Sequence, residues 1–198
     1  MNIAVIPVLD SRLLTGVLAG KTMLDTLVGK LVDIRELDRV VLFCSPNIVS
    51  KIRLKFDRPW DARPLKNDAP VSLLRLRQMV EAPLSADNYL LCSPDFPFVR
   101  PERYQLGLLG LAEKTAMVSA SKNHFSYAPQ CSASFFRFAP WLLDACVGVR
   151  GDVEIRKNEM WHLGEAIGYI PLTDTEMVNV STPEGLRLAE ALVMCGEV

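Results

Sequence analysis

The sequence predicts an α/β protein, a three-layer α/β/α sandwich around a mainly parallel sheet of about seven strands. Three observations lead to this class. Short apolar runs recur along the chain, and they are continuous rather than alternating, which is typical of strands buried on both faces. Segments with helical apolar spacing separate these runs. Prolines, glycines and short polar residues mark the boundaries, so strands and helices are expected to alternate.

The first strand is expected at residues 3–8, a compact run of mostly β-branched residues. A loop over residues 9–21 follows, and it contains two glycines and ends on a lysine. Thr22 then precedes apolar residues at helical spacing, so we expect Thr22 to cap a helix with Asp25 at its third position. A strand, a loop with glycine and lysine, and a helix form an arrangement that can hold phosphate.

The middle of the chain is expected to continue this alternation. Strands are predicted at 40–44 and 89–92, and between them an irregular proline-rich segment at 56–70 and a helix at 71–82. The strand at 89–92 must end there because the prolines that follow cannot donate to a sheet ladder. These strands and the strand at 3–8 are predicted to be neighbours in the interior of the sheet.

Asp95 lies directly after the strand at 89–92, between Pro94 and Pro97. Ligands of open α/β sheets bind at the carboxyl ends of the strands, and a carboxylate there is a candidate Mg²⁺ ligand. The alternative interpretation is that Asp95 only caps the turn.

The last part of the chain is expected to add further strands and helices. Pro101 is well placed at the first position of a helix that runs to about Glu113. The other expected elements are strands at 116–120 and 132–138, a helix at 140–146 stopped by Gly148 and Gly151, strands at 166–172 and 177–180, and a terminal helix with Leu186, Ala189, Leu192 and Val193 inward.

Composition limits the classes of function. The 198 residues are 49% hydrophobic and 23% charged, and we expect a single domain over residues 1–198. The net charge of −1 gives no electrostatic footprint for nucleic acid. Five scattered cysteines without CxxC spacing indicate buried free thiols rather than disulfides or zinc. No apolar run approaches the roughly 18 residues of a membrane span, so a cytoplasmic protein without a membrane partner is expected.

Three segments carry motifs. The first comprises Ile6-Pro7, Ser11-Arg12-Leu13 and Gly20-Lys21, the second is DFPFVRPE at 95–102, and the third is VSTPEGLRLAE at 180–190. In order and spacing they resemble the cytidylyltransferases that activate acidic sugars, such as the 3-deoxy-manno-octulosonate and acylneuraminate cytidylyltransferases. The corresponding family patterns are IPAR-x-x-S-x-R-L-x-GK, D-x-P-F/M-x-x-P/D-E and IDTPEDLxLAE, and the likeness covers nearly the whole chain.

The resemblance implies a nucleotide-diphospho-sugar transferase fold and Mg²⁺-dependent transfer of CMP from CTP to an acidic sugar, with release of pyrophosphate. It also allows a homodimer. The catalytic roles would fall to Lys21, Arg12 and Asp95, with Asp95 as the metal ligand, and Lys122 would meet the acidic sugar. The implied nucleotide-binding positions are Pro7, Val8, Leu9, Ser11, Arg12, Gly20, Lys21 and Ser45.

The chain departs from the resembling family at three positions. Leu9 stands where the family has an arginine, Ser181 where it has a metal-site aspartate, and Gly185 where it has a later aspartate. A neutral hydroxyl cannot replace the charge of a carboxylate toward Mg²⁺. A second interpretation is therefore a catalytically inactive domain that keeps the pocket for binding or regulation.

A third interpretation is a P-loop NTPase or kinase. Residues 16–22, GVLAGKT, are one residue short of a Walker A loop. A Walker A loop follows its strand directly, whereas the first strand here is expected to end at Val8, and no clear Walker B run is present.

Overall fold

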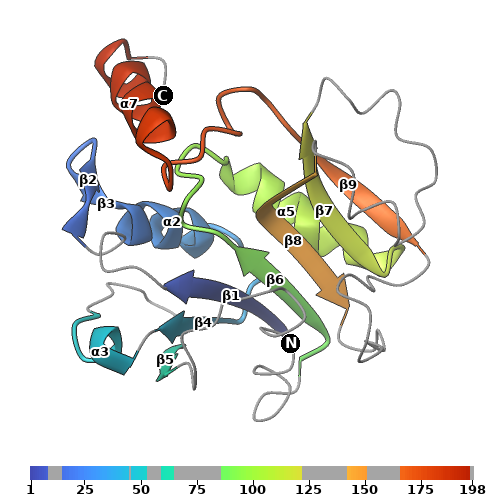
Figure 1. The fold of residues 1–198 in the computed structure, drawn as a ribbon. Coiled ribbons are helices and arrows are strands. Elements are labelled where there is room, and N and C mark those ends of the chain that lie inside the picture. The colour runs from blue at the N-terminus through green and yellow to red at the C-terminus, as the bar shows by residue number, and fades with distance from the viewer. Residues whose placement is uncertain are drawn as a thin grey trace, which may run out of the picture.

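A seven-stranded sheet forms the centre of the computed structural model, which describes residues 1–8, 15–44, 46–52, 59–64, 86–121, 142–150 and 166–196 (Figure 1). The strand order is β5-β4-β1-β6-β8-β7-β9. Every pair of neighbours is parallel except the two that β8 forms with β6 and β7. The mainly parallel sheet confirms the predicted fold class. The strands are β1 (Asn2–Val8), β4 (Arg39–Cys44), β5 (Trp60–Pro64), β6 (Asn88–Cys92), β7 (Ala116–Ser121), β8 (Leu142–Arg150) and β9 (Ile167–Leu172).

The three strands predicted from the strongest apolar runs are neighbours in the sheet interior, as expected. β1 lies between β4 and β6 and pairs in parallel with both. Alternate residues of β1 belong to different cores, since Ala4 and Ile6 pack in one cluster and Ile3 and Val5 in another. Burial on both faces explains why the run is continuously apolar.

Two helices pack on the same face of the sheet, where their apolar side chains join the core cluster of Ala4 and Ile6. Helix α2 (Met23–Val32) begins after its N-cap Thr22, whose Oγ1 accepts a hydrogen bond from the N–H of Asp25 at 3.0 Å. Helix α5 (Pro101–Leu109) has proline at its first position and continues into the 3-10 turn η1 (Gly110–Ala112). Both starts agree with the sequence predictions.

Three smaller elements complete the described part of the chain. β2 (Val17–Leu18) and β3 (Lys21–Thr22) form a separate antiparallel hairpin, and α3 (Pro46–Val49) follows β4. Helix α7 (Pro183–Met194), drawn in red, packs beside β2 (Figure 1). Among the described helices, none has the length and hydropathy that crossing a membrane requires. The helix expected at 71–82 and the strand expected at 132–138 lie outside the described residues.

The irregular segment predicted at 56–70 is partly wrong, because it contains the edge strand β5, paired in parallel with β4. All five residues of β5 are half-buried or exposed, so no apolar run marks the strand in the sequence. Pro64 is its last residue, and an edge strand tolerates proline there.

The helix predicted at 140–146 is also wrong. Strand β8 runs through this region, and Gly148, expected to stop a helix, pairs with Leu90 and Met117 inside the sheet. A Cβ atom on Gly148 would lie 2.5 Å from the carbonyl oxygen of Gly107 in α5. Glycine therefore serves here to let the helix approach the sheet closely.

The strand predicted at 177–180 is wrong as well, since residues 174–177 form turns and no strand lies between β9 and α7. The N–H of Met177 donates to the carbonyl oxygen of Thr173 at 3.1 Å, which closes one of these turns. In α7, Ala189 is buried as predicted, but Leu186 is 37% exposed.

Candidate functional site

A cavity of about 560 Å³ lies where four segments of the chain meet beside Val193 of α7. The β2–β3 hairpin contributes Lys21, α2 contributes Lys30, the loop after β6 contributes Arg100, and the loop after β9 contributes Thr173 and Glu176. The volume is in the range of sites for small organic ligands. Three cationic side chains around one cavity favour an anionic ligand.

Lys21 reaches the cavity because the hairpin has a tight two-residue turn. Ala19 and Gly20 form this turn with φ values of 51° and 78°, the left-handed conformation that a turn of this kind requires at both central residues. Within the described part of the chain, the Lys21 side chain forms no hydrogen bond or ion pair. Its exposed ammonium is therefore open to a ligand.

The hairpin also bears on the P-loop interpretation. Residues 17–22 form antiparallel strands joined by a tight turn, whereas a P-loop winds around phosphate directly between a strand and a helix. This geometry does not support a P-loop NTPase or kinase.

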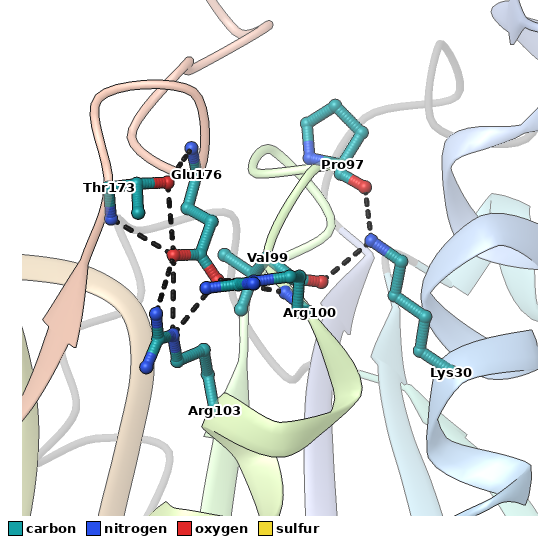
Figure 2. A network of polar contacts seen from close by, with 7 residues as sticks. All are labelled: Lys30, Pro97, Val99, Arg100, Arg103, Thr173 and Glu176. Atoms are coloured by element: carbon teal, nitrogen blue, oxygen red, sulfur yellow. Dashed lines mark hydrogen bonds and ion pairs between the residues drawn. The ribbon is translucent and has the colours of Figure 1, made fainter. Parts of the chain in front are cut away.

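Lys30 ties helix α2 to the loop after β6. Its Nζ donates to the backbone carbonyl oxygens of Pro97 and Val99, the latter at 2.7 Å (Figure 2). Burial lowers the pKa of Lys30 to about 8, although the negative charge of Glu176 acts in the opposite direction. The lysine thereby fixes the segment that follows Asp95.

Glu176 is a buried carboxylate with donors on several sides (Figure 2). Arg103 donates from Nε and Nη2 at 3.0 to 3.2 Å, and Thr173 donates its N–H at 2.9 Å and its hydroxyl at 3.1 Å. Arg100 donates its N–H and its Nε, both at 3.2 Å. Burial alone would raise the pKa of this carboxyl, but the hydrogen bonds outweigh it and lower the pKa to about 2. Glu176 therefore stays ionised and joins the loop after β9 to the start of α5.

Asp95 lies in the turn after β6, as predicted, and is half-buried. Its N–H donates to Ser93 Oγ at 3.3 Å, and Ser93 Oγ lies 3.5 Å from Asp95 Oδ2, so the carboxylate takes part in capping the turn. The carbonyl oxygen of Asp95 accepts a hydrogen bond from the N–H of Val180 at 2.9 Å. The motifs at 95–102 and 180–190 therefore meet in space.

The structure describes only some of the predicted site residues. Lys21 lines the cavity, whereas Asp95 does not, although Pro97, two residues further on, does. Gly20 forms the hairpin turn. Pro7 and Val8 end β1, and the Val8 side chain is fully buried, so only its backbone can face a ligand. The predicted residues Leu9, Ser11, Arg12, Ser45 and Lys122 lie outside the described residues.

Sequence analysis missed Lys30, Arg100 and Glu176, which together with Lys21 give the cavity its charge. Lys30 has the position of an ordinary lysine near the carboxyl end of a helix. Glu176 stands in the polar run Thr-Asp-Thr-Glu, where nothing marks it as buried. Arg100 offered one signal, since it lies within the motif at 95–102.

No family model matches the sequence, and a search of curated proteins found no match. Solved structures are similar in fold. The 4-diphosphocytidyl-2C-methyl-D-erythritol synthase from Anaerococcus prevotii DSM 20548 has a TM-score of 0.71 at 14% identity, covering 98% of this chain and 96% of its own.

Two further structures agree with the first. A CMP:2-keto-3-deoxy-manno-octonic acid synthetase complexed with CTP has a TM-score of 0.68 at 15% identity, covering 100% of this chain and 99% of its own. The 2-C-methyl-D-erythritol 4-phosphate cytidylyltransferase from Thermus thermophilus has a TM-score of 0.65 at 15% identity, covering 96% of this chain and 98% of its own. The chain therefore has the fold of these cytidylyltransferase structures, as its motifs implied.

Proposed function

We propose that the chain is a nucleotidyltransferase that transfers CMP from CTP to an acidic sugar and releases pyrophosphate. The observation that carries this proposal is the cationic cavity beside Lys21, bordered by the loop in which the motif of Asp95 meets the motif of Val180. Structures of the same fold include a synthetase complexed with CTP, which supports a cytidine nucleotide as the ligand.

The residues of the chain would act mainly by binding and orientation. The ammonium of Lys21 would contact the triphosphate and stabilise the negative charge that develops on the leaving pyrophosphate. Arg12 is proposed to share this role, and Lys122 to bind the carboxylate of the acceptor. Lys30 would hold the segment from Pro97 to Val99 in place, so that the cavity keeps its shape during turnover.

Asp95 is the proposed ligand of Mg²⁺. Within the described ranges, no three side chains of His, Cys, Asp or Glu gather into a metal cluster. Mg²⁺ does not require one, because it is often held by one or two carboxylates together with substrate phosphates. A half-buried carboxylate after β6, with the hydroxyl-bearing Ser181 next to Val180, suits such a shared ion. When bound, Mg²⁺ supplies charge neutralisation and alignment of the attacking and leaving oxygens.

The test is an assay of pyrophosphate release with each of the four nucleoside triphosphates, Mg²⁺ and a panel of acceptors. The panel contains 2-keto-3-deoxy sugar acids and, for comparison, a sugar-alcohol phosphate. We expect release with CTP and an acid acceptor only. Lys21→Met should reduce the rate at least tenfold, whereas Arg187→Met, which removes an exposed cation of α7, should not. Release that depends on another triphosphate, or equal rates in both variants, would contradict the proposal.

A second candidate function is a binding or regulatory domain without catalysis. The observation that favours it is the neutral, exposed Ser181 beside the residue bonded to Asp95. The same experiment separates the two functions when CTP binding is measured in parallel. CTP binding without release of pyrophosphate from CTP in the presence of any acceptor would support the binding domain.

A further inference from the structure

Arg100 lies at the cavity with its guanidinium held from one side only. Its Nε donates to Glu176 Oε1 at 3.2 Å, and its backbone N–H donates to the same oxygen (Figure 2). The side chain is 58% exposed. Within the described residues, its two terminal NH₂ groups have no hydrogen-bond partner. Since a guanidinium is planar and rigid, fixing Nε fixes the direction of the remaining N–H groups.

Glu176 is suited to act as the fixed point for Arg100. Its carboxylate is 2% exposed, and Arg103 binds it through two nitrogens while Thr173 donates from both backbone and hydroxyl. A buried carboxylate held from several directions has little freedom to rotate. In Figure 2, Glu176 and Lys30 approach the Val99–Arg100 segment from opposite sides. The segment that carries Arg100 is therefore fixed at its backbone as well as at its side chain.

The charges of this cluster do not cancel. Arg103 is only 18% exposed and neutralises Glu176 by a charge-assisted pair. The guanidinium of Arg100 therefore gives the cluster of Glu176, Arg103 and Arg100 one net positive charge. Lys21 and Lys30 add further positive charge to the cavity. Glu176 is the only carboxylate among the described residues that line it.

We propose that Arg100 binds an anionic oxygen group of the ligand and that Glu176 is the residue that positions Arg100. The group is a phosphate or a carboxylate, from either the triphosphate of the nucleotide or the acid group of the acceptor. Only the identity of the ligand rests on the proposed function. Binding of a simple anion at Arg100 does not require catalysis.

The first test measures anion binding by calorimetry with two probes, tripolyphosphate and a 2-keto-3-deoxy sugar acid. Arg100→Gln should weaken the binding of at least one probe by about tenfold, as the loss of a charged hydrogen bond implies. Weaker tripolyphosphate binding assigns Arg100 to the nucleotide, and weaker sugar-acid binding assigns it to the acceptor. Arg187→Gln, at a 73% exposed arginine of α7, is the matched control and should change neither. Unchanged binding of both probes to Arg100→Gln would overturn the proposal.

The second test separates positioning from a merely structural effect. Glu176→Gln should weaken binding of the same anion about threefold or more in the wild-type background. In the Arg100→Gln background it should cause no further loss of affinity, because Glu176 acts through Arg100. An equal loss in both backgrounds would refute the positioning role. Arg100→Lys leaves the buried pair of Glu176 and Arg103 intact and keeps the charge, but it lacks the planar fork. We expect it to bind as weakly as Arg100→Gln, and full binding by the lysine variant would also refute positioning.

These results are distinguishable from failure of the proposed function. If no pyrophosphate is released with any acceptor while Arg100→Gln still weakens anion binding, the anion site stands and the transferase does not. If pyrophosphate is released but both probes bind equally to wild type and Arg100→Gln, the transferase stands and the role of Arg100 is refuted.

Discussion

The backbone N–H of Val180 donates to the carbonyl oxygen of Asp95 at 2.9 Å, and this bond joins two motifs that lie far apart in the sequence. Asp95 follows β6, and Val180 precedes Ser181 and the N-cap Thr182 of α7. The start of α7 is therefore fixed against the turn in which a metal ligand was predicted. This relationship makes substitutions at the start of α7 informative about that turn.

Ser181→Asp should strengthen Mg²⁺-dependent binding of CTP. A carboxylate added to a partly screened site beside Asp95 would stabilise bound Mg²⁺ by on the order of 1 to 3 kcal/mol. Asp95→Asn should have the opposite effect. The measurement is a titration of CTP with and without Mg²⁺ into the wild type and both variants. Leu188→Asp places a carboxylate at an exposed position of the same helix and serves as the control. If Ser181→Asp folds but leaves the metal dependence unchanged, Ser181 does not lie at a metal site.

Gly185, the other position where the resembling family has an aspartate, should not accept a side chain. A Cβ atom there would lie 1.8 Å from the carbonyl oxygen of Asn179 and 3.0 Å from Thr182 Oγ1. Gly185→Ala should therefore lower the free energy of unfolding by about 1 to 3 kcal/mol, and Gly185→Asp by at least as much. Urea denaturation monitored by circular dichroism measures both.

The control for Gly185 is Gly29→Ala in the interior of α2. A Cβ atom on Gly29 meets nothing within 4 Å, so alanine should be neutral or stabilise the helix by up to about 1 kcal/mol. Equal stabilities of the two alanine variants would show that the start of α7 has room for a side chain. The steric explanation for glycine at this position would then be wrong.

The parts of the fold that the sequence predicted are those whose local pattern and tertiary environment agree. β1, β4 and β6 are buried on both faces and carry continuous apolar runs. Helix α2 has both an apolar stripe and a capping threonine, and α5 has a proline at its first position. Each of these signals is contained within a few consecutive residues.

The wrong predictions concern segments whose structure depends on distant partners. Strand β5 pairs with the edge of β4, and its own residues, which include Asp61 and Arg63, form no continuous apolar run. Gly148 is a sheet residue because α5 approaches it. The motifs pointed to Lys21, which lines the cavity, and to Asp95, which does not. Glu176 is recognisable only when Arg100 and Arg103 surround it. The residues next to Glu176 in the sequence do not show that these distant partners lie close to it.

Glu176 should make the protein sensitive to acid. The pKa of its carboxyl is lowered from 4.5 to about 2, so the folded state binds fewer protons than the unfolded state between these values. The contribution of Glu176 to stability is complete above pH 4.5 and is lost as the pH falls toward 2. The loss should be on the order of 2 to 3 kcal/mol. Urea unfolding of wild type and Glu176→Gln at pH 6 and pH 3 measures it. The difference between the two proteins should shrink at the lower pH, and a constant difference would mean that the carboxyl titrates normally.

Lys30 should make stability depend on pH in the alkaline range. Burial lowers its pKa from 10.5 to about 8, so between these values the folded state binds fewer protons than the unfolded state and stability rises with pH. The neutral amine still has two N–H groups for the carbonyl oxygens of Pro97 and Val99, so deprotonation relieves the desolvation cost without breaking the link to the loop.

The variant Lys30→Met removes the titrating group at Lys30 and leaves both carbonyl oxygens without this donor. We expect the stability lost by Lys30→Met, relative to wild type, to be larger at pH 9.5 than at pH 7, because only the wild type gains from deprotonation between these values. Urea denaturation at several pH values measures the difference. Lys51→Met, at an exposed lysine after α3, is the matched control for the loss of a lysine side chain. If the Lys30→Met difference is constant over this pH range, the Lys30 ammonium is as well solvated in the folded protein as in the unfolded chain.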